Sequence, residues 1–548
     1  MGRVACLFPA LATGALAVDE PAIPHLRQQG TATQLIVDGH PFLVRGGEVN
    51  NSSATNPAYL APYWSKFKAL NLNTLIAPAY WQLIEPEEGH FDFTTVDALL
   101  RDARANRMRI VLLWFGSWKN SMSCYAPDWV KRDVRCFLRA CDQDGNNEEI
   151  LSAFSQENVA VDSSAFAALM RHLRETDGTD HTVVMIQVEN EIGMIPSARD
   201  HCPDADRAFA GAVPAELMGN LAERSDRLQP RLKAAWSAAG GRKAGSWAEV
   251  FGDTPAGEEI FMAWYFGRYT EAVAAAGKRE YPLPMYANAA LIRPGYQPGQ
   301  YPSAGPLPHL ANVWRAAAPS IDILSPDIYF QDFIDWARSY KQPGNPLFIP
   351  EATRSPEASV NCLYAFGALD AIGFSPFGIE SISDSAAKDL AASFSLVAQL
   401  EPLLLSSQGF GKTAGFLPEG PEQRQPQKVA LGGYLLSATF EKGTPPALAD
   451  GVIVPSAPAQ VSAPSPSGGL VIATGPDEFI IAGTGLAITF ESGRPRMAAG
   501  ILSAEEGRFV DGKWENILWL SGDQTHQGRH IRLEAGRFSV QRVKLYRY

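Results

Sequence analysis

Two glutamates in this 548-residue chain, Glu191 and Glu351, each stand just after a short apolar run. A carboxyl group that protonates a departing glycosidic oxygen needs a pKa raised to about 6 to 7 by burial and by a neighbouring carboxylate. A second carboxylate that stays ionised can attack the carbon that the oxygen leaves. We therefore predict Glu191 as general acid/base and Glu351 as nucleophile, about 5 to 5.5 Å apart if the reaction retains configuration.

Two further polar residues, Asn190 and Tyr329, are candidates for roles beside these glutamates. Asn190 precedes Glu191 and fits a donor to the sugar hydroxyl beside the reacting carbon. Tyr329, in the peptide Ser325–Tyr329, carries a phenol that could hydrogen-bond Glu351 and keep it ionised. A tyrosine that only packs at the rim of the fold is an equally good interpretation of Tyr329.

The elements that must position these residues follow the pattern of an α/β protein, a (β/α)8 TIM barrel. Short apolar runs alternate with segments of helical period, which is typical of parallel strands covered on both faces. The expected strands are Phe42–Val44, Asn73–Ile76, Ile110–Phe115, Val183–Val188, Met285–Tyr286, Ile321–Leu324, Leu347–Ile349 and Ile372–Phe374. Because barrel strands end at one mouth, the fourth and seventh bring Glu191 and Glu351 together.

Local signals set the boundaries of this barrel. Asp38 and Gly39 separate two apolar runs, a strong hairpin signal, and the hairpin leads into the first strand. Helices are expected where apolar residues recur with helical spacing, over 60–67, 96–103 and 166–173. Thr94 and Asp162 stand near the expected N-cap positions. Residues 196–257 exceed one connection and are predicted to form an insertion after the fourth strand.

The chain divides into three predicted parts. Residues 1–17 contain an apolar run followed by the small residues Ala15–Ala17, which predicts a signal peptide and a periplasmic or secreted protein. An ordinary buried N-terminal segment is the alternative. Residues 18–405 form the barrel, and 406–548 form a C-terminal antiparallel β domain, expected to be a sandwich. No later stretch is expected to be long enough to span a bilayer.

Composition excludes some functions. The net charge is −12 and no Lys/Arg-rich run is present, so nucleic acid is not an expected partner. Cys124, Cys136 and Cys141 are close enough in sequence for a local disulfide in an oxidising compartment. His526 and His530 lack the glutamate of a metalloprotease helix and are interpreted as surface residues. We expect neither a metal nor a cofactor.

A family resemblance sharpens this interpretation. The peptide Gln187–Gly193, Gln-Val-Glu-Asn-Glu-Ile-Gly, resembles the signature of glycoside hydrolase family 35, the β-galactosidases of clan A. Tyr80-Trp81 and the segment 85–93 resemble the second-strand region of that family. The resemblance covers residues 24–405. It implies that Glu191 is the acid/base and Glu351 the nucleophile, and that Tyr80, Glu189 and Asn190 contact the sugar.

The chain also departs from this family. Ile192 stands where tyrosine is usual, and Gly116-Ser-Trp-Lys-Asn120 replaces a Cys-Ala-Glu-Trp pattern that supplies a galactose-binding glutamate. Trp118, Lys119 and Asn120 are the candidate substitutes. At the first strand, Glu48 and Asn50 are candidate polar contacts. The departures indicate a divergent branch, similar to bacterial enzymes that trim galactose from plant xyloglucan.

Aromatic residues offer further candidate sugar contacts. Trp118 is the best candidate for stacking on a sugar face, whereas Trp114 lies inside an apolar run and is expected in the core. In the β domain, Trp514, Trp519 and Tyr546 could form a glycan-binding surface, although packing is the favoured interpretation.

These observations predict an exo-acting retaining β-glycosidase that releases terminal β-D-galactose from oligo- or polysaccharides, a plant cell-wall glycan among them, by double displacement. An exo-β-glucosaminidase or β-glucosidase of the same clan is one alternative. A non-catalytic glycan-binding protein is the other.

Overall fold

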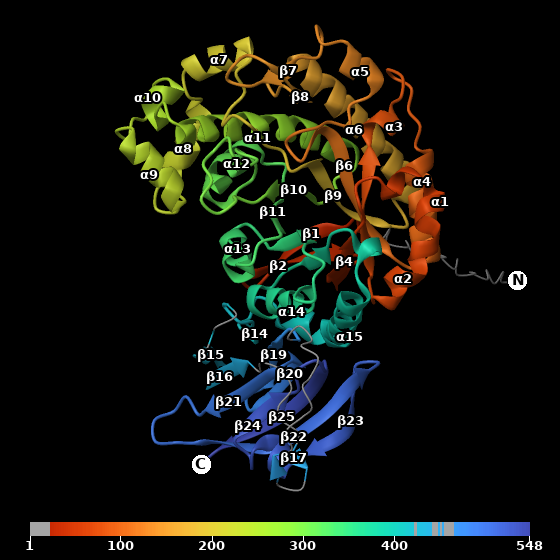
Figure 1. Ribbon diagram of the computed structural model, residues 1–548, viewed down its shortest axis with the longest axis vertical. Coiled ribbons are helices and arrows are strands. Elements are labelled where there is room, and N and C mark those ends of the chain that lie inside the picture. The colour runs from red at the N-terminus through yellow and green to blue at the C-terminus, as the bar shows by residue number, and fades with distance from the viewer. Residues whose placement is uncertain (1–21, 421–422, 424, 441–447, 450–451, 454–464) are drawn as a thin grey trace, which may run out of the picture.

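The computed structural model describes residues 22–420, 423, 425–440, 448–449, 452–453 and 465–548. The predicted signal peptide lies outside the described residues. Eight parallel strands form a closed barrel, and two antiparallel sheets follow it in the chain (Figure 1). The predicted fold class, a (β/α)8 barrel with a C-terminal antiparallel β domain, is confirmed.

The barrel strands follow chain order around the barrel. They are β4 (Val44–Glu48), β5 (Thr74–Tyr80), β6 (Arg109–Lys119), β9 (Val183–Asn190), β10 (Met285–Ala290), β11 (Ile323–Ile328), β12 (Phe348–Ala352) and β13 (Gly373–Pro376). All eight predicted strands are present. The predicted bounds of the first strand were wrong in detail, because Phe42 belongs to the preceding hairpin and the barrel begins at Val44.

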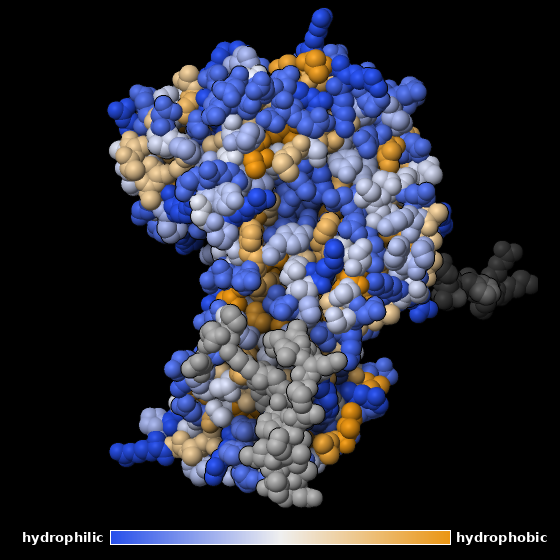
Figure 2. All heavy atoms as spheres, viewed as in Figure 1, coloured by the Kyte–Doolittle hydropathy of each residue, from blue (hydrophilic) through white to orange (hydrophobic). Residues whose placement is uncertain are grey.

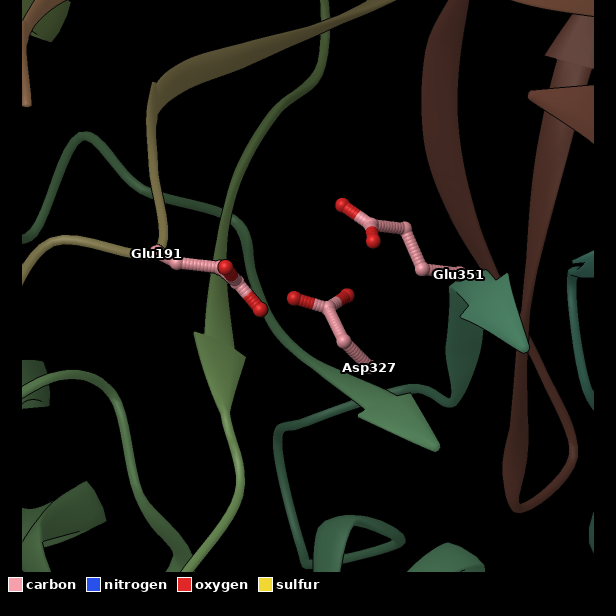
Figure 3. Close-up of side chains that lie close together, drawn as sticks. All are labelled: Glu191, Asp327 and Glu351. Carbon is pink, nitrogen blue, oxygen red and sulfur yellow. The ribbon is translucent and has the colours of Figure 1, made fainter. Parts of the chain in front are cut away.

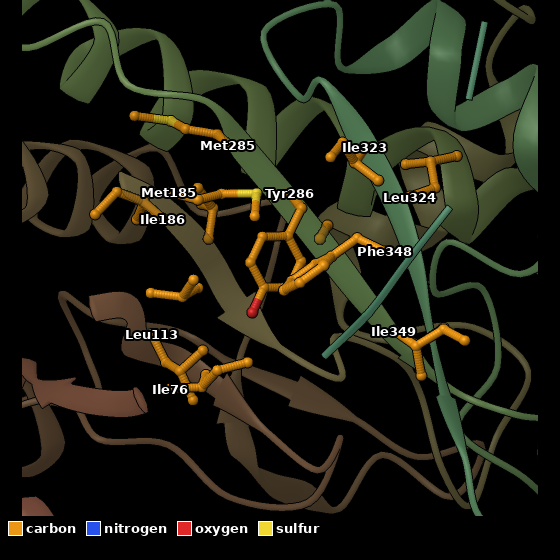
Figure 4. Packing of buried hydrophobic residues seen from close by; sticks show 14 of the residues in the cluster. Ile76, Leu113, Met185, Ile186, Met285, Tyr286, Ile323, Leu324, Phe348 and Ile349 are labelled. Atoms are coloured by element: carbon orange, nitrogen blue, oxygen red, sulfur yellow. The ribbon is translucent and has the colours of Figure 1, made fainter. Parts of the chain in front are cut away.

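Large side chains fill the barrel interior below its mouth. Tyr286 of β10 packs edge to face against Phe348 of β12, with 5.1 Å between the ring centres. Met185 and Leu113 close the same layer from β9 and β6 (Figure 4). The interior is thus a packed core and not a pore, so a substrate can enter only at the carboxyl ends of the strands.

The N-terminal hairpin packs beneath the barrel. Strands β1 (His25–Gln29), β2 (Ala32–Val37) and β3 (His40–Phe42) form an antiparallel sheet. Asp38 and Gly39 both have positive φ, 51° and 77°, as the predicted tight hairpin requires. Asp38 Oδ1 lies 2.8 Å from Nδ1 of His181, just before β9, which holds the hairpin against the N-terminal ends of the strands.

A helix follows each barrel strand. In chain order these helices are α2 (Trp64–Ala69), α4 (Thr94–Ala105), α6 (Gln156–Asp177), α11 (Pro255–Glu280), α12 (Ala311–Ala317), α13 (Phe333–Tyr340), α14 (Ala358–Leu369) and α15 (Asp384–Ser407). The helix expected over 60–67 is interrupted, because α1 (Pro57–Leu60) and a 3₁₀ turn precede α2.

Both expected N-caps were misplaced. Phe93 is the N-cap residue of α4, and Thr94 is its first helical residue. In α6 the cap is Ser155, whose side chain accepts the N–H of Asn158, so Asp162 lies in the middle of the helix. The buried position of Asp162 has consequences for the site described below.

Two excursions cover the upper part of the barrel in Figure 1. After β6 come α5 (Asp128–Arg132), β7 (Arg139–Cys141) and β8 (Asn147–Leu151). After β9 come α7 (Pro203–Ala210), α8 (Ala215–Glu223), α9 (Pro230–Ala238) and α10 (Trp247–Phe251), within the segment expected as an insertion. All five cysteines of the described residues are free, so the local disulfide is not formed among them.

The C-terminal part contains two stacked sheets. Strands β14 (Thr413–Phe416), β19 (Gly468–Gly475), β20 (Glu478–Thr484), β25 (Ser539–Arg547), β22 (Ala499–Val510) and β23 (Lys513–Leu520) form one. Strands β15 (Gln427–Leu431), β16 (Tyr434–Phe440), β21 (Leu486–Glu491) and β24 (His530–Leu533) form the other. A separate hairpin joins β17 (Leu448–Ala449) to β18 (Val452–Ile453). Residues of both larger sheets share one buried apolar cluster between them.

The other face of the six-stranded sheet packs against the barrel. Leu470, Ile480 and Val540 belong to the same buried cluster as the barrel core, and α14 and α15 lie next to this sheet. Trp514 also packs, against Phe509, and donates to Glu505 at 2.7 Å. Trp519 and Tyr546 are exposed, so the prediction that these aromatic residues pack holds only for Trp514.

Among the described residues one helix, α15, is long and apolar enough to cross a membrane by length and composition alone. The expectation that no later stretch has this length was therefore wrong. Its apolar side chains Leu390, Phe394, Val397 and Leu400 are buried in the core, which is the behaviour of a core helix. The surface seen in Figure 2 is mainly hydrophilic, with small hydrophobic patches.

Candidate active site

Three carboxylates meet at the mouth of the barrel. Glu351 lies in β12, Asp327 lies in β11, and Glu191 directly follows β9. One oxygen from each of the three lies within 4.8 Å of the others. Figure 3 shows Glu191 and Asp327 pointing toward the space beside Glu351. The structure thus brings the two predicted glutamates together and adds an aspartate.

Glu351 receives three hydrogen bonds. The phenol of Tyr329 donates to Oε2 at 2.6 Å, as the sequence predicted. The side-chain amides of Asn190 and Asn288 each donate to Oε1 at 3.3 Å. Donors directed at a carboxylate favour its ionised form, which is the form that can act as a nucleophile.

Glu191 has a different environment. Burial, followed by the charge of Glu351, raises the pKa of Glu191 to about 7, while Lys119 and a hydrogen bond from Asp327 act in the opposite direction. A carboxyl group with this pKa can donate a proton and later accept one near neutral pH. The geometry therefore suits Glu191 to the acid/base role predicted for it.

The backbone of Glu191 is held on both sides. Its φ is +47°, a left-handed conformation that costs a non-glycine residue about 1 kcal/mol or more. Its N–H donates to Oδ1 of Asn288 at 2.9 Å, and its carbonyl accepts from Oγ of Ser121 at 2.5 Å. These two bonds fix the direction in which the side chain leaves the strand end.

The sequence analysis missed Asp327 and Asn288. Asn288 accepts from the backbone N–H of Glu191 and donates to the carboxylates of Asp327, at 2.7 Å, and Glu351, so it links all three residues. Burial and the charges of Glu351 and Glu191 raise the pKa of Asp327 well above its ordinary value. Both residues lie just beyond the apolar runs predicted as the fifth and sixth strands, and the rule that found Glu351 could have found them.

Lys119 and Asn120 lie beside this cluster at the end of β6. The ammonium group of Lys119 donates to Oδ1 of Asn190 at 2.7 Å and also to Oδ1 of Asn120. Asn120 is partly exposed beside Lys119, and its role as a sugar contact stays a prediction. Asn50, the other candidate polar contact, is bonded away from the three carboxylates. Its side-chain amide donates to Ser381 and its backbone N–H donates to Glu380.

Two predicted sugar contacts are instead part of the core. Trp118 is buried, and its ring packs edge to face against Tyr269 and Phe266 of α11, so it faces the helical layer and not the mouth of the barrel. Tyr80 is also buried, and its hydroxyl donates to the carbonyl of Asn51 at 2.7 Å. The irregular end of β6 turns Trp118 toward the helices, which a spacing argument cannot detect.

Glu189 likewise faces the helical layer. Its Oε2 accepts the N–H of Trp118 at 2.8 Å, and its carboxyl group is hydrogen-bonded to that of Asp162 on α6. Asp162 also accepts from Trp114 at 2.8 Å and from Tyr269 at 3.0 Å. Burial and the charge of Asp162 raise the pKa of Glu189 well above its ordinary value. The assignment of Glu189 as a sugar contact was wrong in this structure.

The three site carboxylates have the spacing of a cation site. Carboxylate oxygens are the ligands that Mg²⁺ and Ca²⁺ prefer. However, Tyr329, Asn190 and Asn288 direct hydrogen atoms at the oxygens of Glu351 and Asp327, which a cation would need. This donor set favours proton transfer, and the expected absence of a metal stays a prediction.

Comparison with known families places the barrel near one group of enzymes. Residues 61–260 match the model of the family described as "Beta-galactosidase", Glyco_hydro_42. The barrel resembles beta-galactosidases. That match contains Glu191 but not Glu351. Residues 390–532 match a domain of unknown function, DUF5597.

Curated relatives agree over the same region. Beta-galactosidase of Xanthomonas manihotis is 33% identical over 204 residues, which are 36% of this chain and 31% of that protein. Beta-galactosidase-1-like protein 3 of Homo sapiens is 25% identical over 190 residues, which are 33% of this chain and 26% of that protein. The chain thus spans less than a third of the length of these two relatives.

Solved structures with a similar chain path include two bacterial beta-galactosidases. The enzyme from Rahnella sp. R3 has a TM-score of 0.44 and 18% identity, covering 66% of this chain and 56% of the other. A GH42 enzyme from G. stearothermophilus, solved as a catalytic mutant, has a TM-score of 0.44 and 15% identity, covering 66% and 57%.

Proposed function

We propose that this protein is an exo-acting retaining β-galactosidase with Glu351 as nucleophile and Glu191 as acid/base. The observation that carries the proposal is that an oxygen of each lies within 4.8 Å of the other. This close approach of single oxygens favours a retaining enzyme, whose two carboxyl groups stand about 5 to 5.5 Å apart, over an inverting enzyme, which needs about 6.5 to 9.5 Å between the groups to admit a water molecule.

The mechanism uses the different environments of the two glutamates. Ionised Glu351 attacks the anomeric carbon, the glycosidic C–O bond breaks, and protonated Glu191 gives its proton to the leaving oxygen. Glu191, now ionised, then takes a proton from water. The resulting hydroxide attacks the anomeric carbon, which releases the sugar and restores Glu351 as a carboxylate.

The galactose specificity rests on similarity. The family match over 61–260 and the named relatives support a galactoside substrate. The signature over 187–193 supports family 35 within that group, and the departures from the family pattern support a bacterial enzyme that acts on a plant cell-wall glycan. Export to the periplasm or the medium is proposed from residues 1–17.

Hydrolysis of p-nitrophenyl β-D-galactopyranoside tests the proposal, beside the matching glucoside and glucosaminide. We expect the galactoside to react and Glu351→Gln to lose that activity. Proton NMR of the first-formed sugar should show the β anomer. A first-formed α anomer would contradict retention, and preference for either other substrate would favour the glucosidase or glucosaminidase alternative. Binding of galactose without turnover of any substrate would indicate a glycan-binding protein.

A further inference from the structure

Glu48, the last residue of β4, is a buried carboxyl group without a partner. Its side chain is 0% exposed, and neither of its oxygens has a hydrogen-bond partner within the part of the chain that the structure describes. A buried polar group without a partner is costly, and each such group in a folded protein needs an explanation. The mechanism proposed above does not use Glu48.

The charges around Glu48 place it at the same mouth as the reacting pair. Four charged neighbours act on the pKa of Glu48. Glu351 has the largest effect, followed by Lys119, Glu191 and Glu380. The barrel order sets β4 next to β13 and therefore two strands from β12, which carries Glu351. The charge of Glu48 also acts on the hydroxyl of Tyr286, which is buried and likewise has no partner in the described structure.

Three polar side chains near this rim have partners other than Glu48. Lys119 donates to Asn190 and Asn120, and Asn50 donates to Ser381. Glu380 accepts from Ser53 and from the N–H of Asn50. Within the described part of the chain neither oxygen of Glu48 has a protein partner, and a bound substrate would supply one.

We propose that Glu48 binds a ring hydroxyl of the terminal sugar at a position other than C2 and so determines which sugar the site accepts. This inference rests on the proposed function. Asn190, which touches Glu351, is the residue placed to meet the 2-hydroxyl. Glu48 ends β4, which is three strands from β9 around the barrel, so we expect it to meet a hydroxyl farther from the reacting carbon.

The protonation state of Glu48 suits a hydroxyl partner. Burial, followed by the charge of Glu351, raises the pKa of Glu48 well above its ordinary value. A protonated carboxyl group can donate to a hydroxyl and accept from it at the same time. The expected ligand is therefore a neutral hexose with an unmodified hydroxyl at this position.

The test compares Glu48→Ala and Glu48→Gln with wild type on p-nitrophenyl β-D-galactopyranoside and its 2-, 3-, 4- and 6-deoxy analogues. We expect Glu48→Ala to lower kcat/KM for the parent by about 10- to 100-fold, as for loss of one strong hydrogen bond. One of the 3-, 4- or 6-deoxy analogues should then react about as well as the parent in this variant. The factor by which 2-deoxy substitution lowers kcat/KM should be the same in Glu48→Ala as in wild type.

Glu48→Gln and Asn50→Ala serve as controls. A glutamine keeps a donor and an acceptor, so Glu48→Gln should retain most of the activity and the wild-type pattern. Asn50→Ala alters the same rim without facing the site and should also keep that pattern. Thermal melting verifies that each variant is folded.

Two results would overturn different claims. If each deoxy substitution lowers kcat/KM by the same factor in Glu48→Ala as in wild type, Glu48 contacts no hydroxyl, although the enzyme is still a galactosidase. If wild type does not hydrolyse the parent galactoside, the proposed function fails and this inference fails with it.

Discussion

At the residue scale, Glu191 and Glu351 are the same amino acid in unlike surroundings. Three donors point at Glu351, whereas burial and the charge of Glu351 raise the pKa of Glu191 to about 7. The contrast matches what double displacement demands, because one group must be ionised when the other is protonated. Asn288 supports both conditions, since it touches each of them.

Glu191→Ala should slow substrates in proportion to their need for an acid. A dinitrophenyl leaving group departs without protonation, whereas an alkyl or sugar leaving group does not. We expect a loss of about 10²- to 10⁴-fold in kcat/KM on unactivated galactosides and a much smaller loss on activated ones. Added azide should restore turnover of the activated substrate and give β-galactosyl azide. Equal losses on both kinds of substrate would contradict the acid/base assignment.

Lys119→Met should shift the pH dependence of kcat. Lys119 lowers the pKa of Glu191, so its removal raises that pKa above about 7. The acid must be protonated, and the rate therefore falls as pH rises through its pKa. The basic limb of the profile should move to higher pH in Lys119→Met.

A control for this shift is Lys278→Met. Lys278 pairs with Asp322 at 2.6 Å, before β11 and at the opposite end of the barrel. Its replacement removes an equal charge away from the carboxylates and should leave the basic limb in place. A limb that stays fixed in Lys119→Met, or that moves equally in both variants, would contradict the argument.

At the element scale, the end of β9 is supported by a buried carboxyl pair. Glu189, with φ of +61°, hydrogen-bonds to the end of β6 and to Asp162 of α6. The pair connects the helical layer to the strand end two residues before the acid/base. Asp162 appeared in the sequence as a helix cap, and only its contacts with Trp114 and Tyr269 reveal its role.

Asp162→Ala should lower the free energy of unfolding by about 3 kcal/mol or more. The change leaves the buried donors of Trp114, Ser117 and Tyr269 without their acceptor, and each such group costs about 1 to 3 kcal/mol. Asp162→Asn keeps one oxygen and should lose less. Urea unfolding measures both, with Glu175→Ala on the exposed face of α6 as the control. A loss no larger than in that control would contradict a structural role for the pair.

The sequence predicted where each barrel strand begins better than where it ends. Apolar runs mark the packed lower part of the barrel, whereas the upper ends carry polar residues and prolines that break the pattern. Strand β10 was expected to stop at Tyr286 and reaches Ala290, which hid Asn288. Strand β11 was expected to stop at Leu324 and reaches Ile328, which hid Asp327. The polar residues of the site lie at these strand ends, so the apolar pattern did not reveal them.

The errors at Trp118 and Glu189 have a common cause. A motif fixes which residues follow a strand but not the face to which each side chain turns. Positive φ at Glu189 and the register shift between Trp114 and Lys119 rotate those side chains toward the helices. Such irregularities depend on packing with α6 and α11, which are distant in sequence.

At the scale of the whole molecule, the barrel and the six-stranded sheet share a core. Helix α14 carries Gly367 at this contact, where an added Cβ would lie 2.6 Å from Cβ of Leu470 and 2.7 Å from the carbonyl oxygen of Ala414. Neither atom can move far, because one belongs to a buried core residue and the other to a backbone strand. A glycine is required here for the sheet to approach the helix.

Gly367→Val should therefore destabilise the contact between barrel and sheet. We expect a loss of about 1 to 3 kcal/mol or more from overpacking, seen in calorimetry as a lower Tm and a transition that separates into two. The control is Gly219→Val in α8, a helical glycine with no atom within 4 Å of an added Cβ, which gives the same change in side chain without the clash. If both variants melt as a single unchanged transition, the close approach at Gly367 does not hold the two parts together. If galactoside hydrolysis persists after the two transitions separate, the barrel carries the activity without its contact to the sheet.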